Sequence, residues 1–223
     1  MIIAIDGPAG SGKSTTARAV ARAMAYAHLD TGAMYRTAAL ALHLKGFKTD
    51  SSESAGILEN AVIEIAPDDG ATIVHLDGHD VSSTIRTPEI GTMASQVATL
   101  PALRGKLVDQ QRRIIGKLEE EYGGVVIEGR DIGTVVVPGA DFKFFMTASV
   151  EIRAQRRVRQ LADQGQQVSL DDTIAGILER DNRDVNRSES PLREAEDAIT
   201  VDTTTMSVDD QVLFIVNQIN QID

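Results

Sequence analysis

The chain of 223 residues is long enough to bury a core, and its 42% hydrophobic and 25% charged residues are typical of a globular domain. Its formal net charge of −11 opposes general binding to a nucleic acid polymer or to an anionic membrane. Cysteine is absent, which excludes a disulfide framework, and no apolar run approaches roughly eighteen residues, so with no secretory signal we expect one cytoplasmic domain.

The first part of the chain alternates strand and helix signals. Strands are expected at 2–6 and 27–30, and helices at 13–25 and 33–45. Gly46 marks the end of the second helix, because glycine favours the left-handed conformation that follows many helices. Asp50 and Glu53 have the spacing of a capping box, which predicts another helix start.

The pattern of apolar and polar residues changes at residues 61–86. Residues 62–65 and 72–76 alternate between apolar and polar types, as strands with one exposed face do, and the turn sequence 67–70 separates them. Asp77-Gly78 indicates a second hairpin. We therefore expect a small antiparallel β insertion at about 61–86 within a core of residues 1–60 and 87–223.

The remainder returns to helices and strands in turn. Helices are expected to begin at Thr87-Pro88 and Leu100-Pro101, because proline is favoured at the first helical position. Further strands are expected at 125–128, 142–147 and 198–202, and further helices at 150–163, 170–186 (capped by Ser169) and 208–222. Strands separated by helices indicate an α/β fold with a mostly parallel sheet.

The turn after the first expected strand contains a complete G-x-x-x-x-G-K-[ST] pattern. It reads Gly7-Pro8-Ala9-Gly10-Ser11-Gly12-Lys13-Ser14. Its backbone N–H groups and the start of the next helix would bind the phosphates of a nucleoside triphosphate. Lys13 is expected at the β- and γ-phosphates, and the Ser14 hydroxyl is expected to bind Mg²⁺. An ordinary glycine turn needs neither this lysine nor a strand before it and a helix after it. The pattern therefore predicts a three-layer P-loop NTPase fold with a central five-stranded parallel sheet.

Two further motifs follow expected strands. Thr31, Tyr35 and Arg36 belong to a DTGAMYR sequence after the second strand, and Arg130-Asp131 follows the strand at 125–128. Ligands of doubly wound sheets bind beyond the carboxyl ends of the strands, so these side chains are expected near the phosphate loop. The alternative for the first motif is a capped helix start with a surface arginine.

Arginines are concentrated in residues 153–193 of this acidic chain. Arg180, Asp184 and Arg187 are spaced to lie on one helix face. The concentration indicates an anion site. A solvated helix face with mixed charge is the alternative, and charge alone leaves both open.

The four motifs together resemble those of the bacterial cytidylate kinase family over essentially the whole chain. Ser95-Gln96-Val97 and Pro101-Ala102-Leu103-Arg104 add to the similarity. The resemblance implies transfer of a phosphoryl group from ATP to CMP or dCMP, with Mg²⁺. Adenylate, thymidylate, shikimate and gluconate kinases share the first motif and not the rest.

The resemblance also implies the roles of individual residues. Residues implied to bind ATP are Gly7, Gly10, Ser11, Gly12, Lys13, Ser14 and Thr15. Residues implied to bind the acceptor nucleotide are Thr31, Tyr35, Arg36, Ser95, Arg104, Arg130, Asp131, Arg180, Asp184 and Arg187. Ser95, Arg104 and Asp131 would read the cytosine, which presents one donor and two acceptors.

Two segments are implied to move or close. The insertion at about 61–86 would help to enclose CMP, and residues 153–165 would form a lid. Arg153 and Arg157 of that lid are implied to be catalytic together with Lys13. The role of Glu128 stays open.

Three other functions fit parts of the pattern. A kinase for a non-nucleotide acceptor would need the arginines but not the set Ser95, Arg104 and Asp131. A regulatory NTP switch is opposed by the absence of an N-K-x-D motif, and RNA binding by the acidic charge and the lack of aromatic residues among the arginines. The four histidines fit no metal-ligand spacing. No base is required, because the acceptor is an anionic phosphate oxygen. We expect a monomer that binds small nucleotides and neither nucleic acid nor membrane.

Overall fold

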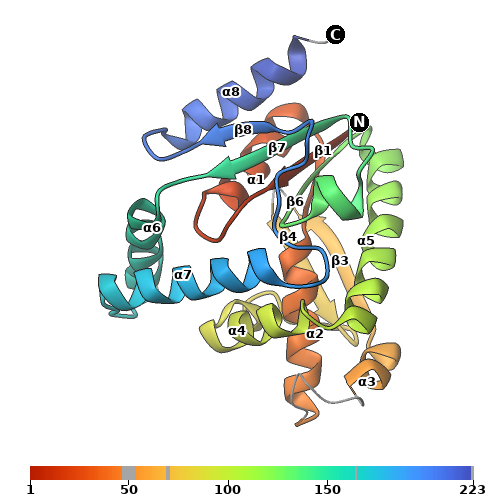
Figure 1. Cartoon of the computed structure of the whole chain (residues 1–223). Coiled ribbons are helices and arrows are strands. Elements are labelled where there is room, and N and C mark those ends of the chain that lie inside the picture. The colour runs from red at the N-terminus through yellow and green to blue at the C-terminus, as the bar shows by residue number, and fades with distance from the viewer. Residues whose placement is uncertain (47–53, 69–70, 164, 222–223) are drawn as a thin grey trace.

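The computed structural model describes residues 1–46, 54–68, 71–163 and 165–221 and contains a central five-stranded parallel sheet (Figure 1). The strand order is β2-β6-β1-β7-β8, and each neighbouring pair is parallel. The strands are β1 (Ile2–Asp6), β2 (Ala27–Asp30), β6 (Val125–Gly129), β7 (Phe142–Thr147) and β8 (Ile199–Asp202). This confirms the predicted fold class.

Both faces of the sheet are covered, which explains why its strands are almost continuously apolar. On one face, Ile3 and Ile5 of β1 pack with α1 and α8, and on the other Ala4 packs in the cluster that includes α5. These helices are α1 (Lys13–Met24), α5 (Pro101–Tyr122) and α8 (Val208–Asn220). The result is a three-layer arrangement.

The remaining helices are α2 (Thr31–Leu44), α3 (Ser54–Asn60), α4 (Pro88–Val97), α6 (Val150–Asp163) and α7 (Leu170–Asn186), with a short 3₁₀ turn at Thr84–Arg86. Of these helices, α6 and α7 lie near the carboxyl ends of the strands, α2 leads away from the sheet, and α3 lies at the far end of α2 (Figure 1). The predicted Pro88 and Pro101 helix starts and the Ser169 cap are confirmed. No helix of the described ranges is long and apolar enough to cross a membrane.

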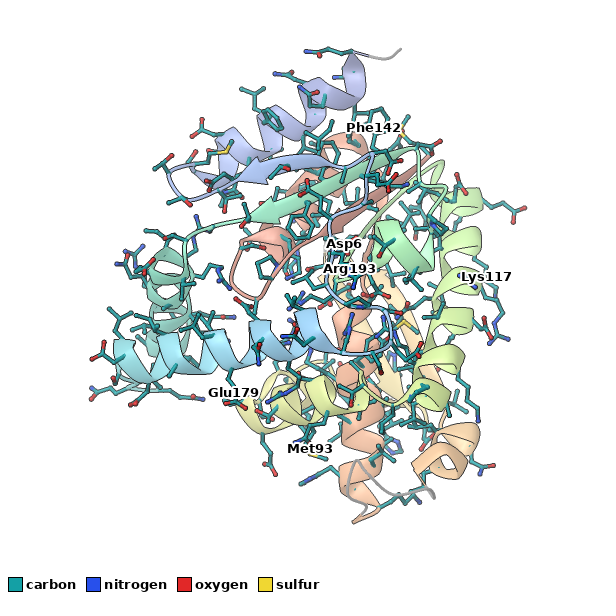
Figure 2. The ribbon with its side chains drawn as sticks, viewed as in Figure 1. Asp6, Met93, Lys117, Phe142, Glu179 and Arg193 are labelled. Carbon is teal, nitrogen blue, oxygen red and sulfur yellow. The ribbon has the colours of Figure 1, made fainter. Side chains whose placement is uncertain are left out.

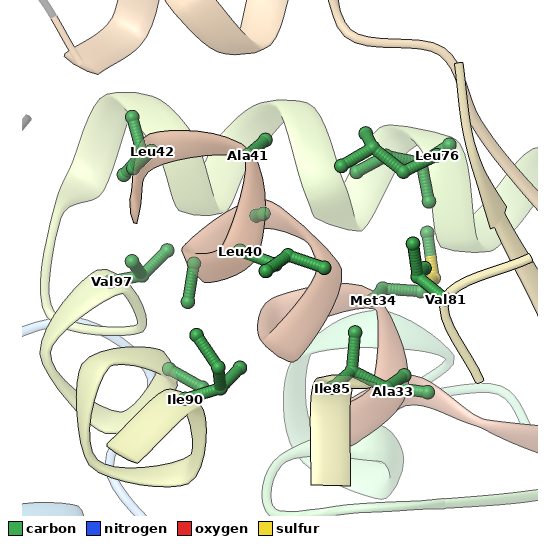
Figure 3. Close-up of a cluster of buried hydrophobic side chains, with 14 of the residues drawn as sticks. Ala33, Met34, Leu40, Ala41, Leu42, Leu76, Val81, Ile85, Ile90 and Val97 are labelled. Atoms are coloured by element: carbon green, nitrogen blue, oxygen red, sulfur yellow. The ribbon is translucent and has the colours of Figure 1, made fainter. Parts of the chain in front are cut away.

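A second, antiparallel sheet occupies the position of the predicted insertion. Its strands are β3 (Ile63–Asp68), β4 (Ala71–Leu76) and β5 (His79–Asp80). Asp77 and Gly78 join the last two with φ values of 52° and 80°, as a tight hairpin turn requires. Leu76 of this sheet is buried in one hydrophobic cluster with side chains of α2 such as Met34 (Figure 3).

Several boundaries differ from the prediction. Helix α2 begins at Thr31 rather than at residue 33, because the Asp30 carboxylate accepts the N–H of Ala33 at 3.0 Å and caps the helix. Strand β3 continues through the first half of the turn expected at 67–70. The capping box expected at Asp50 and Glu53 lies outside the described residues.

An unexpected π-helical turn at Ile132–Val136 follows β6. The buried Asp6 carboxylate accepts the N–H groups of Ile132 at 2.9 Å and Gly133 at 2.8 Å. Asp6 lies at the centre of the molecule (Figure 2), and its burial raises the pKa of the carboxyl to about 6. Asp6 therefore holds the loop that carries Arg130 and Asp131.

Candidate active site

A cavity of about 1020 Å³ opens at the carboxyl ends of β1, β2 and β6, between the glycine-rich loop, α4 and α7. Most of the predicted site residues line it: Gly10, Gly12, Lys13, Ser14, Thr15, Thr31, Tyr35, Arg36, Ser95, Arg104, Arg130, Asp131, Arg157, Arg180, Asp184 and Arg187. Gly7, Ser11 and Arg153 are not part of the lining. Segments far apart in the sequence thus contribute to one cleft.

The glycine-rich loop has the geometry of a phosphate cradle. A Cβ on Gly7 would lie 2.1 Å from the carbonyl oxygen of Met146, so no larger residue fits there. Gly12 has a φ of 95° and precedes α1 without a side-chain cap, which leaves the first N–H groups of the helix for a ligand. The buried Ser11 hydroxyl also has no hydrogen-bond partner among the described residues. These features fit the phosphates of a nucleoside triphosphate.

Lys13 is almost fully buried beside this loop, and its Nζ donates to the carbonyl oxygen of Pro8 at 3.1 Å. Burial, and secondly the charge of Arg130, lower the pKa of the Lys13 ammonium to about 7. An anionic phosphate placed next to Lys13 would favour its charged form.

Ser14, Glu128 and His28 form a hydrogen-bonded series below the loop. The Ser14 hydroxyl donates to Oε2 of Glu128, and Oε1 of the same carboxylate lies 3.2 Å from Nε2 of His28. The described residues contain no cluster of three or more metal-ligating side chains. Magnesium in nucleotide sites needs only one or two protein oxygens in addition to phosphates and water. The Ser14 hydroxyl and the Glu128 carboxylate therefore fit Mg²⁺.

The far end of the cleft contains a buried ion pair between Arg104 and Asp131. The Arg104 guanidinium also lies 5.5 Å from the centre of the Tyr35 ring, and Arg187 approaches Asp131 to 3.8 Å. Ser95 accepts a hydrogen bond from Arg183 at 3.0 Å. Donors and an acceptor thus converge where a small polar ring could bind.

The middle of the cleft is crowded with cations. Arg36 pairs with Asp30 at 2.6 Å, and Arg130 pairs with Asp184 at 3.1 Å. Arg180 has no ion pair within the described part of the chain, and burial, followed by the charge of Arg130, lowers its pKa to about 10. Such unneutralised charge favours an anionic ligand.

The two lid arginines singled out by sequence differ in position. Arg157 lines the cleft, and its partner is the nearby Gln160. Arg153 is buried against the outside of the glycine-rich loop, where it pairs with Asp181 at 2.6 Å and donates to the carbonyl oxygen of Ala9 at 3.1 Å. The expected catalytic role of Arg153 stays a prediction, and this placement favours Arg157.

Sequence reasoning missed several residues that shape the site. Arg183 lines the cleft and contacts Ser95, although helical spacing alone gave no reason to separate it from a surface arginine. Asp30 both caps α2 and orients Arg36. Its position directly before an expected helix could have indicated the cap. His28 gave no signal, because its partner Glu128 is 100 residues away.

Comparison with known proteins gives consistent results. The sequence profile of the family described as cytidylate kinase matches residues 3–221. The cytidylate kinase of Syntrophotalea carbinolica is 47% identical over 214 residues, covering 96% of this chain and 88% of the relative. That of Carboxydothermus hydrogenoformans is 46% identical over 214 residues, covering 95% and 94%. An uncharacterized protein from Eubacterium ventriosum shares the fold, with a TM-score of 0.50 and 15% identity over 99% of this chain and 98% of that structure.

Proposed function

The chain belongs to the cytidylate kinase family of ATP-dependent enzymes that phosphorylate CMP and dCMP, and from this premise we propose how its cleft binds the two nucleotides. The observation that carries the proposal is the order of groups along one cavity. The phosphate cradle with Lys13 lies at one end, the Arg104–Asp131 pair at the other, and the cationic group between them.

The glycine-rich loop and Lys13 bind the ATP phosphates. The uncapped N–H groups of α1 meet the phosphate oxygens, and the Lys13 ammonium regains its full charge there. Ser14 and Glu128 would hold Mg²⁺, which, when bound, neutralises charge between the β- and γ-phosphates. The Thr31 hydroxyl donates to the backbone carbonyl oxygen of Glu128 at 2.7 Å and so joins the start of α2 to the end of β6 beside this site.

The central arginines hold the acceptor phosphate in line with the donor. Arg36, Arg130 and Arg187 come from three different segments and can approach one phosphate from several sides. No side chain needs to remove a proton, because the attacking oxygen is already anionic. The protein therefore contributes position and charge neutralisation.

Asp131, Arg104 and Ser95 read the cytosine. An ionised carboxylate accepts hydrogen bonds only, so Asp131 pairs with the N4 amino group of cytosine, while the Arg104 guanidinium donates to the N3 and O2 side. The existing Arg104–Asp131 pair keeps both side chains in place before CMP arrives. The small sheet at 63–80 supports this end of the cleft through α2 and α4, and α6 acts as the lid. We expect the enzyme to work as a monomer in the cytoplasm.

The base-reading role is tested by measuring kcat/KM for CMP and UMP in Asp131→Ala. Uracil presents an O4 acceptor where cytosine has its amino donor, and a buried unpaired polar group costs about 1–3 kcal/mol, roughly ten- to hundredfold in specificity. The variant should lose most of its CMP activity and little UMP activity, so that the CMP/UMP ratio falls toward one.

Asp109→Ala, an exposed aspartate of α5, is the matched control and should keep the wild-type ratio. If Asp131 only holds Arg104 in the fold, both acceptors lose activity equally. An unchanged ratio in Asp131→Ala would remove it from the base-reading group.

A further inference from the structure

His28 is a buried titratable residue to which the reaction described above assigns no task. It lies in β2, where it is the register partner of Val126 in the adjacent strand β6. Val126 packs with the α1 side of the core, and side chains of a strand alternate between faces. His28 and Glu128, two residues beyond Val126, therefore lie diagonally adjacent on the face that α1 covers, directly below Ser14.

The two oxygens of the Glu128 carboxylate contact different residues, His28 and Ser14. Oε1 lies 3.2 Å from Nε2 of His28, and Oε2 accepts the hydrogen bond from the Ser14 hydroxyl. The side chains of His28 and Glu128 are only 2% and 3% exposed, so the contact between the imidazole and the carboxylate is buried. The imidazole thus supplies the second hydrogen bond that fixes the rotation of the carboxylate about its last side-chain bond.

We propose that His28 is a positioning residue for the metal–nucleotide site: it orients Glu128, which in turn orients the Ser14 hydroxyl. Groups that bind metals are commonly held by partners one shell further out, and loss of such a partner costs about 10–100-fold in metal affinity. The inference rests on the proposed role of Ser14 and Glu128 toward Mg²⁺. It extends that role to a residue of a different strand.

The competing interpretation is that His28 only fills space under the phosphate loop. Leucine has a similar volume but cannot donate a hydrogen bond, whereas the amide of glutamine ends near the position of the histidine Nε2 and can donate. Asparagine has the same amide on a shorter side chain. His28→Leu, His28→Gln and His28→Asn therefore separate packing from donation.

The test is calorimetric binding of ADP to the full-length enzyme, once with Mg²⁺ and once with EDTA. His28→Leu should weaken ADP binding about tenfold with Mg²⁺ and less than about twofold in EDTA, because only the metal-bound nucleotide depends on Ser14 and Glu128. His28→Gln should stay within about threefold of wild type in both conditions. If His28→Leu does not fold, His28→Asn against His28→Gln provides the same comparison.

Two controls keep the outcomes distinct. Leu29→Met changes the same strand on its opposite face and should leave the Mg²⁺ effect unchanged. In a Glu128→Ala background, His28→Leu should cause no further loss, since the partner through which it acts is absent. Equal losses with Mg²⁺ and EDTA, or a full second loss in Glu128→Ala, would overturn the inference. If the wild type itself bound ADP equally with and without Mg²⁺, the metal role of Ser14 would fail instead.

Discussion

Two cationic side chains of the cleft have few hydrogen-bond partners in the structure without nucleotides. Lys13 is held by one backbone carbonyl, and Arg180 has a buried Nε without a partner among the described residues. Burial, and secondly the positive charge of Arg130, lowers the pKa of Lys13 to about 7 and that of Arg180 to about 10. At neutral pH Arg180 therefore keeps its charge and Lys13 is only partly charged, so phosphate oxygens would neutralise the first group and favour the charged form of the second.

Lys13→Ala should reduce kcat by roughly 10²–10³ while the protein stays folded, because a neutral side chain cannot offset the charge that develops on the β- and γ-phosphates. Steady-state assays with CMP measure the loss, and circular dichroism checks the fold. Lys117→Ala, on the exposed outer face of α5 (Figure 2), is the matched control and should behave as wild type. Activity of Lys13→Ala within threefold of wild type would contradict the assigned role.

At the scale of single residues, sequence predicts a side chain well when a local motif fixes its position. Lys13 and Ser14 are fixed by the glycine-rich loop, and both line the cleft as expected. No such motif fixes Arg153 or Arg183. Both lie in arginine-rich helices, where neighbouring arginines can either line the cleft or pack against other elements. Their contacts with Asp181 and Ser95 depend on how α6, α7 and α4 pack, which helical periodicity does not contain.

At the scale of elements, the site is built from strand ends and helix starts. Lys13 begins α1 after β1, Arg36 lies near the start of α2 after β2, and Arg130 follows β6, as expected for the carboxyl edge of a parallel sheet. Short continuous apolar runs predict the strands because both sheet faces are buried. The strand order and the π-helical turn after β6 depend on contacts between residues far apart in the sequence. One example is the Asp6 carboxylate, which accepts the N–H groups of Ile132 and Gly133, and no local sequence signal predicts these contacts.

Helix α6 is attached to the glycine-rich loop through its first two turns, and Arg159 and Gln160 further along are exposed. Arg153 joins α6 to Ala9 of the loop and to Asp181 of α7, and Arg156 joins it to Ser11 at 3.3 Å, whereas the hydrogen bond of Arg157 goes to Gln160 of the same helix. Because Arg157 lines the cleft without an anchor outside α6, we expect this segment to respond when phosphates bind.

Backbone hydrogen exchange at residues 157–163 should therefore slow when a non-hydrolysable ATP analogue and CMP are bound together. Exchange is measured by mass spectrometry on the free enzyme, on each binary complex and on the ternary complex. Residues 112–122 of α5, remote from the cleft, serve as the internal reference. Equal exchange at 157–163 in the free and ternary states would contradict closure of this segment.

At the scale of the whole molecule, charge is separated between exterior and cleft. The formal net charge of −11 repels polyanions, while the cleft gathers at least six cationic side chains: Lys13, Arg36, Arg104, Arg130, Arg180 and Arg187. A small nucleotide can enter such a cleft, but a nucleic acid polymer would also meet the acidic surface. The molecule as a whole is thus suited to free nucleotides, in agreement with its family.

The central claim is that this cleft transfers phosphate to cytidine monophosphates because it reads the cytosine edge. It is tested most directly by measuring kcat/KM with ATP and Mg²⁺ for CMP, dCMP, UMP, AMP, GMP and dTMP under the same conditions. CMP and dCMP should be the best acceptors, with AMP, GMP and dTMP poor, since their bases do not match the donors and acceptor of Ser95, Arg104 and Asp131. A higher kcat/KM for AMP or dTMP than for CMP would contradict the account.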